Sequence, residues 1–187
     1  MIFSLLLTLA LDWDLPASGK FSIEKENGVE VIRMLEPGPK NPVPRRPQTF
    51  VLARTQPFQK VTIECEVKRH GKSLIIVYAY QDEAHFNYAH LSSDTAKQVA
   101  VHNGMFHVYG NERVRISNTE GPASLPSDEW TKVRFTHDGS TGRAWVEVNG
   151  QKFPSLVAVD LSLTRGRVGF GSFNETASFR NIRITGE

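Results

Sequence analysis

The stretch WTKVRFTHDGSTGRAWVEVNGQKFP, residues 130–154, decides the fold class. Apolar and polar side chains alternate over residues 130–137 and again over residues 143–149, which is the period of a strand with one buried face. The segment Asp-Gly-Ser-Thr-Gly at 138–142 supplies the residue types that tight turns require. The stretch therefore predicts an antiparallel hairpin whose inward side chains contribute to a core, namely Val133, Phe135, Ala144, Val146 and Val148.

Much of the rest of the chain repeats this pattern of short runs. The runs are rich in β-branched and aromatic residues, and Gly, Pro, Asn or Asp separate them. No segment has the period of about 3.6 residues that marks an amphipathic helix. The further predicted strands are 29–35, 49–54, 60–69, 73–81, 85–92, 98–103, 106–109, 113–117, 167–173 and 178–185. So many short strands predict an all-β domain with two sheets packed face to face.

Length and composition restrict the classes of protein. The chain has 187 residues, which fits one domain over residues 11–187. It carries 22 basic and 20 acidic side chains, a formal net charge of +2, and no long basic run. A protein that neutralises nucleic-acid phosphates needs a basic patch, so nucleic-acid binding is not indicated. The single cysteine, Cys65, cannot form an internal disulfide, and the alternating run VTIECEV around it predicts a core residue.

The first ten residues, MIFSLLLTLA, are mostly apolar. The apolar run 2–11 is too short to cross a bilayer, which takes about 20 residues, so no membrane span is predicted. Thr8 and Ala10 give the small-x-small pattern of a signal-peptidase site, although no Lys or Arg precedes the run. We interpret residues 1–10 as an export signal, which would place the protein in the periplasm or outside the cell. The alternative is a first strand packed in the core.

Prolines are concentrated in the segment MLEPGPKNPVPRRPQ, residues 34–48, which holds five of the ten in the chain. Proline lacks the N–H group that a strand donates to its neighbour. The segment is therefore predicted to be an extended or looped excursion, and such an excursion could border a site.

The second half of the chain carries a family resemblance. Its features are Trp-x-x-Val-Arg at 130–134, the Asp-Gly hairpin, Asn149-Gly150, GRVGFGSF at 166–173 and FRNI at 179–182. This order resembles the concanavalin A-like jelly roll and, more narrowly, laminin-G-like bacterial domains grouped as 3-keto-disaccharide hydrolase domains. TIECEVK and YAYQDEAHFNYAHLS match the middle of the same pattern, so the resemblance covers roughly residues 49–186.

The resemblance implies a two-sheet jelly-roll β-sandwich that is exported and that binds or acts on an oligosaccharide or polysaccharide. Some members of this broad group hold a calcium ion. No EF-hand-like spacing of oxygen ligands is present in the sequence, so no calcium ligand, other metal site or cofactor is assigned. The sequence leaves the oligomeric state open.

The stretch YAYQDEAHFNYAHLSS, residues 78–93, is the best site candidate, because tyrosine and histidine rings have polar tips that need water, a ligand or a partner. With a three-residue turn at 82–84, one face would carry the rings of Tyr78, Tyr80, Phe86, Tyr88 and His90. A two-residue turn would shift the register and pair Tyr80 with Asn87. A return strand at 98–103 would place His102 beside His90. The cluster favours a saccharide groove, although a mixed core with partnered histidines is the alternative.

Candidate roles follow from the residue types. A polysaccharide lyase needs a base, an acid and a group that neutralises a carboxylate, and histidine, tyrosine and arginine can supply these roles. The candidate catalytic residues are His90, His102, Tyr80 and Tyr88. The candidate substrate-binding residues are Tyr78, Arg113, Arg115 and Asn103. The two arginines would suit an acidic sugar, although a solvated strand face explains them equally well.

The sequence gives less support to other kinds of catalytic site. A retaining glycosidase needs two carboxyl groups about 5 Å apart. Glu64 and Glu66 lie about 6.5 Å apart along one strand, opposite its apolar positions, and are predicted to form a solvent-exposed face. No CxxC, HExxH, P-loop or GxSxG motif is present. Three hypotheses remain: a carbohydrate-binding protein, a lyase or glycoside hydrolase, and a structural or interaction domain without catalysis.

Overall fold

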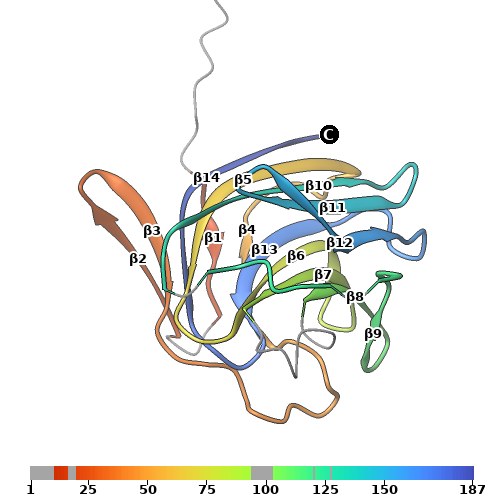
Figure 1. The fold of residues 1–187 in the computed structure, drawn as a ribbon, viewed down its shortest axis with the longest axis horizontal. Helices are drawn as coiled ribbons and strands as arrows, with labels where there is room; N and C mark the ends of the chain where they lie inside the picture. Colours follow the sequence, from red (N-terminus) through yellow and green to blue (C-terminus); the bar gives the residue numbers. More distant parts are fainter. Residues whose placement is uncertain (1–10, 17–19, 94–102, 120, 127) are drawn as a thin grey trace, which may run out of the picture.

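The computed structural model describes residues 11–16, 20–93, 103–119, 121–126 and 128–187. In this part of the chain there are strands but no helices, and the strands form two seven-stranded antiparallel sheets (Figure 1). Sheet A contains, in spatial order, β1 (Trp13–Asp14), β4 (Thr49–Ala53), β13 (Arg167–Ser172), β6 (Ser73–Asp82), β7 (His85–Ser92), β8 (Gly104–Tyr109) and β9 (Arg113–Arg115). Sheet B contains β12 (Gln151–Val159), β11 (Arg143–Val148), β10 (Thr131–Asp138), β5 (Lys60–Arg69), β14 (Ala177–Gly186), β3 (Val29–Met34) and β2 (Phe21–Glu26).

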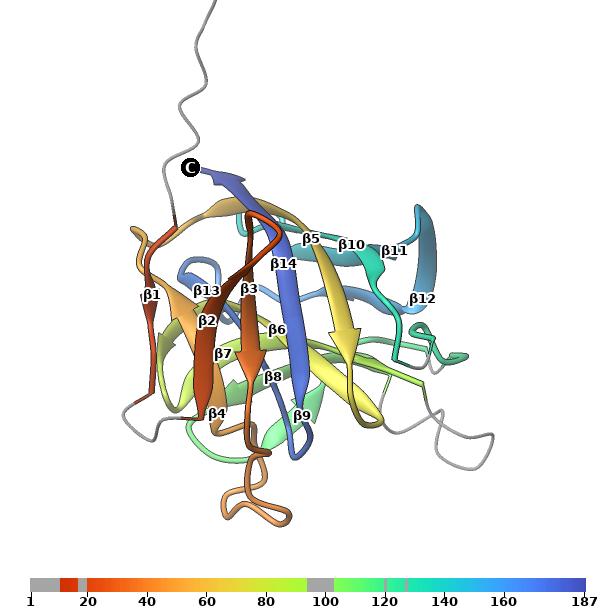
Figure 2. The same cartoon turned by 90° about the vertical axis from the view of Figure 1, so that its left-hand side faces the viewer.

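The two sheets pack face to face, as Figure 2 shows from the side, and enclose an apolar core. Its largest buried rings include Phe135, Phe170 and Phe179. Cys65 lies in this core, as predicted, and burial raises the pKa of its thiol to about 12. The prediction of an all-β, two-sheet jelly-roll sandwich is confirmed.

The hairpin at 130–154 has the predicted pairing. Val133 lies opposite Val148 and Phe135 opposite Val146 in β10 and β11, and all four side chains are buried. The inward positions alternate with exposed ones because successive side chains point to opposite faces of a strand.

Three strands were not predicted, and all three lie at sheet edges: β1 in sheet A, and β2 and β12 in sheet B. An edge strand pairs on one side only, so it tolerates charges, short length and proline. β12 contains Pro154, and its pairing with β11 is interrupted between Trp145 and Glu147. Because of the proline and the irregular pairing, the sequence of β12 lacks the regular alternation of apolar and polar residues that identifies a strand.

The prediction at 98–103 has a different outcome. Residues 98–102, including His102, lie outside the described residues, as do residues 1–10 with the predicted export signal. Asn103 is not in a strand, and β8 is the neighbour of β7, with His90 opposite Gly104. No helix in the described residues is long and apolar enough to cross a membrane.

Candidate functional site

The outer face of sheet A carries a second apolar cluster, separate from the core between the sheets. We call it the outer cluster, and its buried members are Leu52, Ile75, Val77, Phe86, Tyr88, Phe106 and Val108, with Phe50 and Tyr80 packed against them. Ile75 and Val77 alternate along β6 with Leu74 and Ile76, which belong to the inter-sheet core. The outer cluster therefore faces away from sheet B.

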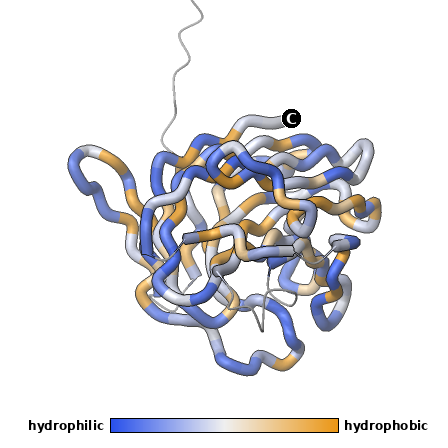
Figure 3. The backbone as a smooth tube through the Cα atoms, viewed as in Figure 1, coloured by the Kyte–Doolittle hydropathy of each residue, from blue (hydrophilic) through white to orange (hydrophobic). Residues whose placement is uncertain are grey.

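The proline-rich segment 36–48, which we call the strap, crosses this outer face. It leaves β3 and enters β4, and on the way it reaches the far edge of sheet A. There, Arg113 N–H donates to Arg45 O (3.1 Å), and Arg46 Nη1 donates to Asn111 O (3.3 Å). Figure 1 shows the strap on the side of sheet A that faces away from sheet B, and Figure 3 shows that it is mostly hydrophilic. The prediction of a looped excursion is confirmed.

A β-bulge decides which rings of the β6–β7 hairpin reach the outer face. Val77 pairs with Tyr88 and Tyr78 with Asn87, after which the register shifts until Asp82 pairs with His85. Ala79 has a positive φ of 49° in this bulge. As a result Tyr80 packs against the outer cluster to which Val77 belongs, although only two residues separate them and strict alternation would put them on opposite faces. The hairpin closes with a two-residue turn, Glu83–Ala84, rather than the three-residue turn, but the bulge places Tyr78, not Tyr80, opposite Asn87.

The prediction that Tyr78 shares a face with the other rings is therefore wrong. Tyr78 points between the sheets, where its ring centroid lies 4.7 Å from that of Phe135 and 5.0 Å from that of His137. The bulge inserts extra residues between Tyr78 and the turn, so the strict alternation assumed from the sequence fails at this point.

Tyr88 and His90 lie on the outer face but are covered. Tyr88 is fully buried, His90 is 2% exposed, and the ring centroid of Phe173 lies 6.3 Å from that of His90. Arg113 Nη1 donates to Tyr88 Oη (3.2 Å), and burial raises the pKa of Tyr88 to about 12. Phe173 thus lies against His90, and Arg113 lies against Tyr88. The predicted catalytic roles of Tyr88 and His90 remain predictions.

Asn103 is fully buried away from the outer face. Its Oδ1 accepts from Ser92 N–H (3.2 Å) and Ser124 Oγ–H (2.7 Å). Its Nδ2 donates to Pro122 O (2.8 Å) and Ser155 Oγ (3.0 Å). Four hydrogen bonds satisfy the amide, so its position indicates a link between segments rather than contact with a ligand.

An open pocket of about 590 Å³ lies where the strap meets the first strands of sheet A. We call it the aromatic pocket, because the half-buried rings of Phe50 and Tyr80 line it. The centroids of these two rings lie 5.7 Å apart. Its other lining residues are Asp14, Leu15, Pro16, Val43, Pro44, Arg46, Pro47, Gln48, Leu52 and Glu83. Most of the lining residues are thus apolar, with the charged and amide groups of Asp14, Arg46, Gln48 and Glu83 among them.

The ionisable groups of the aromatic pocket differ in their environments. Hydrogen bonds from Arg167 and from Arg54 (2.9 Å) lower the pKa of Asp14, so its carboxylate is a weak base. Burial raises the pKa of Tyr80, and the carboxylates of Glu83 and Asp82 raise it further. The phenol therefore stays protonated and can donate a hydrogen bond.

Sequence reasoning found Tyr80 but missed most of its neighbours in the pocket. Phe50 was read only as part of a strand and Glu83 only as a turn residue. Asp14 lies in an edge strand that was not predicted. The prolines of the strap were the one available signal, because they indicated an excursion that could border a site.

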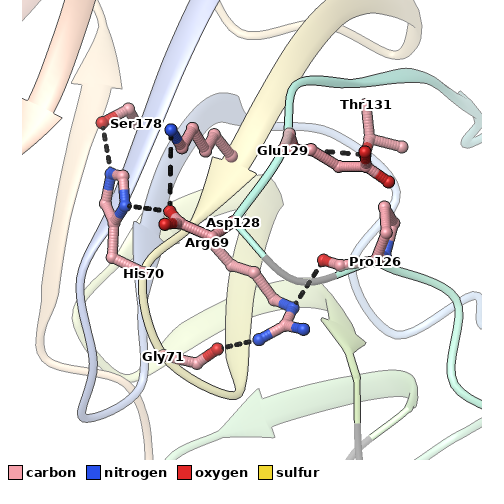
Figure 4. A network of polar contacts seen from close by, with 9 residues as sticks. Arg69, His70, Gly71, Pro126, Asp128, Glu129, Thr131 and Ser178 are labelled. Carbon is pink, nitrogen blue, oxygen red and sulfur yellow. Dashed lines mark hydrogen bonds and ion pairs between the residues drawn. The ribbon is translucent and has the colours of Figure 1, made fainter.

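A serine, a histidine and an aspartate meet on the outer face of sheet B (Figure 4). His70 Nε2 lies 2.8 Å from Ser178 Oγ, and His70 Nδ1 lies 3.0 Å from Asp128 Oδ1. The arrangement resembles a catalytic triad in its atom pairs. However, Ser178 is 1% exposed in a strand that pairs on both sides, with Arg33 and Lys68 opposite it. We interpret the network as a link that joins three segments.

Glu64 and Glu66 lie on the same outer face of sheet B, as predicted. Glu66 Oε2 accepts from Arg180 Nε (2.7 Å), which lowers the pKa of Glu66, and Arg183 Nη1 lies 3.7 Å from Glu64 Oε2. Both carboxylates are thus held by arginines. Among the described residues, no group of three or more His, Cys, Asp or Glu side chains could hold a metal ion.

The two antiparallel sheets and the strapped outer face define a jelly-roll β-sandwich. The chain belongs to the 3-keto-alpha-glucoside-1,2-lyase-like domain family, whose model matches residues 13–185. This match confirms the family resemblance found in the sequence. No curated protein matches the chain in sequence.

Solved structures share the fold at low sequence identity. Carbohydrate binding module CBM66 from Bacillus subtilis has a TM-score of 0.63 and 11% identity, over 88% of this chain and 91% of that chain. A Bacillus subtilis protein with a galectin-like fold has a TM-score of 0.59 and 15% identity, over 94% of this chain and 89% of that chain. At these identities the likeness concerns the fold alone.

Proposed function

We propose that this protein binds carbohydrate on the outer face of sheet A, with a sugar ring in the aromatic pocket. The observation that carries the proposal is the pocket itself, in which Phe50 and Tyr80 present ring surfaces beside Asp14, Arg46 and Gln48. A sugar ring has apolar C–H faces and a rim of hydroxyl groups. A site with apolar walls and a few polar groups around them suits such a ligand.

The family and the fold support this proposal. The family description refers to a glucoside, and CBM66 is named as a carbohydrate binding module. Of the residues predicted from the sequence, Tyr80 contacts the ligand directly, whereas Tyr88 and His90 are buried beside Arg113 and Phe173. The proposal also retains the exported location that the sequence predicts.

Replacing Tyr80 with alanine is expected to weaken glycan binding about fivefold to tenfold, because the ring surface that contacts the sugar is removed. Titration calorimetry against a panel of neutral and acidic oligosaccharides measures the affinity. Tyr109→Ala is the matched control, because Tyr109 is exposed at the end of β8 and does not line the aromatic pocket. Equal affinities of the wild type and Tyr80→Ala would contradict the placement of the sugar. Absence of binding to every oligosaccharide would contradict the proposed function.

A second candidate function is favoured by the family description, which names a 1,2-lyase acting on a 3-keto-α-glucoside. In that elimination the C2–H bond breaks, a C1=C2 double bond forms and the C1–O bond breaks. A base takes the C2 proton, and the departing oxygen takes a proton from an acid. In the aromatic pocket, Glu83 is the candidate base and the protonated Tyr80 phenol is the candidate acid.

Replacing Glu83 with glutamine is expected to slow this elimination about 100-fold, because the amide cannot accept the C2 proton. The assay follows release of the alcohol from a 3-keto-α-glucoside, with Glu112→Gln as the control for an exposed glutamate outside the aromatic pocket. If wild-type protein releases no more alcohol than buffer does, the protein is not a lyase for that substrate class. Glycan binding without turnover would leave binding as the function.

A further inference from the structure

A second pocket, of about 210 Å³, lies where the middle of the strap meets Arg113 of β9 and Phe173. We call it the basic pocket, because it is lined by three cationic side chains, Lys40, Arg45 and Arg113, and by no carboxylate. Its remaining lining residues are Asn41, Pro42, Val43, Phe173 and Asn174. Two amides thus add hydrogen-bond donors beside the three cations.

The guanidinium of Arg113 is held in place before any ligand arrives. Its Cζ lies 4.7 Å from the ring centroid of Phe106 and 4.7 Å from that of Phe173, and Nη1 donates to Tyr88 Oη. Contact with aromatic rings orients a guanidinium and leaves other N–H groups able to bind an anion. Little side-chain freedom remains to be lost on binding, which favours affinity.

These cations lack a protein counter-charge. In the part of the chain that the structure describes, no ion pair involves Lys40, Arg45 or Arg113. Other arginines do have acidic partners, as Arg180 has Glu66 and Arg167 has Asp14. Three cations side by side without an acidic partner repel one another, and an anionic ligand would relieve this repulsion.

The two pockets adjoin. Val43, which is 91% exposed on the strap, borders both the aromatic pocket and the basic pocket. One extended ligand can therefore lie across Val43 and occupy both. Because the aromatic pocket suits a sugar ring, the charged group most simply belongs to a neighbouring sugar of the same chain.

We propose that the basic pocket binds the carboxylate of a uronic acid residue, so that the ligand class is an acidic oligosaccharide. The inference rests on the proposed carbohydrate-binding function and specifies its ligand. The planar guanidinium of Arg113 can form two parallel hydrogen bonds to a carboxylate, whereas Lys40 and Arg45 add charge from the strap.

The test compares oligouronides of four sugar types with their fully methyl-esterified counterparts by titration calorimetry. Esterification removes the charge and leaves the sugar ring in place. We expect the free acid of at least one sugar type to bind roughly tenfold to hundredfold more tightly than its ester. Added salt should reduce this difference, because the carboxylate and the cations attract each other through partly exposed surfaces.

Replacing Arg113 with glutamine should abolish the preference for the acid over the ester. Arg134→Gln on sheet B is the matched control and should keep the preference. Thermal unfolding checks the fold of each variant, and Lys40→Gln with Arg45→Gln, both exposed, tests the pocket if Arg113→Gln unfolds.

A failure of the uronate assignment can be distinguished from a failure of the proposed carbohydrate-binding function. Equal binding of acids and esters overturns the carboxylate site and keeps the carbohydrate-binding function. Absence of binding to every acid and every ester overturns both. If inorganic sulfate displaces the acid at equal molar concentration, the pocket binds anions without regard to the sugar, which also overturns the uronate assignment.

Discussion

Replacing Gly166 with alanine is expected to destabilise the protein by about 3 kcal/mol. Gly166 precedes β13 and packs against the bulge of β6. A Cβ atom at this position would lie 2.2 Å from Ala79 C and 2.4 Å from Tyr80 N. Backbone atoms in a paired strand cannot move as the end of a flexible side chain can, so the bulge itself would have to shift. Urea denaturation followed by tryptophan fluorescence measures the free energy of unfolding.

The bulge also sets the direction of Tyr80, so Gly166→Ala should weaken glycan binding even at temperatures where the variant is folded. The control is Gly150→Ala. A Cβ at Gly150 would meet no atom within 4 Å, but its φ of +79° is unfavourable for alanine. This backbone penalty alone should cost about 1 kcal/mol. If Gly166→Ala costs no more than Gly150→Ala, the close approach does not constrain the bulge.

Lowering the pH from 6.5 to 4 is expected to reduce the free energy of unfolding by about 3 kcal/mol through His137 alone. His137 is 2% exposed between the sheets, and neither ring nitrogen has a hydrogen-bond partner among the described residues. Burial lowers the pKa of His137 from 6.5 to about 4, although Asp138 and Asp160 nearby oppose the shift. The folded protein therefore keeps this ring neutral at a pH where the unfolded chain protonates it.

The direction of this pH dependence follows from how many protons the folded and unfolded states bind at His137. Between pH 6.5 and 4 the unfolded state binds the extra proton, so stability falls by about 1.4 kcal/mol for each unit that the pH drops. Above pH 6.5 both states are neutral at His137, and below pH 4 both are protonated, so the contribution is constant outside this window.

His137→Phe should remove this acid-induced loss. Phenylalanine fills a similar volume beside Tyr78 and leaves no unsatisfied nitrogen in the core, so stability at pH 7 should stay equal or increase by about 1 kcal/mol. Urea denaturation from pH 4 to 7 compares the wild type with this variant. His85→Phe is the control, because His85 is partly exposed and contacts Asp82 at the surface. An unchanged pH dependence in His137→Phe would show that His137 is not the source.

Much of the fold could be predicted because its determinants are local. Alternation over 130–149, with turn residues between the two runs, predicted β10 and β11, and the same reasoning predicted β5, β6 and β7. The three edge strands were missed because an edge strand needs no strict alternation. Pro154 in β12 shows this, since proline is excluded from central strands but tolerated at an edge.

The site was predicted in part. Alternation placed Tyr88 and His90 on the outer face with Phe86, but it also placed Tyr78 there. The error at Tyr78 has a specific cause, the bulge at Ala79, which packs closely against Gly166, 87 residues further along the chain. Arg113 and Arg115 were chosen for their charge, yet the rings that orient Arg113 come from β8 and from the segment after β13.

The residue pattern was enough to predict the all-β class, the family, the looped excursion of the strap and the concentration of polar-tipped rings in one hairpin. Each of these follows from the residue types over short stretches, because side-chain period and turn chemistry act locally. Three features could be found only in the folded protein. The strap crosses sheet A, Tyr80 reaches a pocket while Tyr78 enters the core, and Lys40, Arg45 and Arg113 meet. These outcomes depend on contacts between distant segments, and the packing of those segments, rather than any local pattern, determines where each side chain lies.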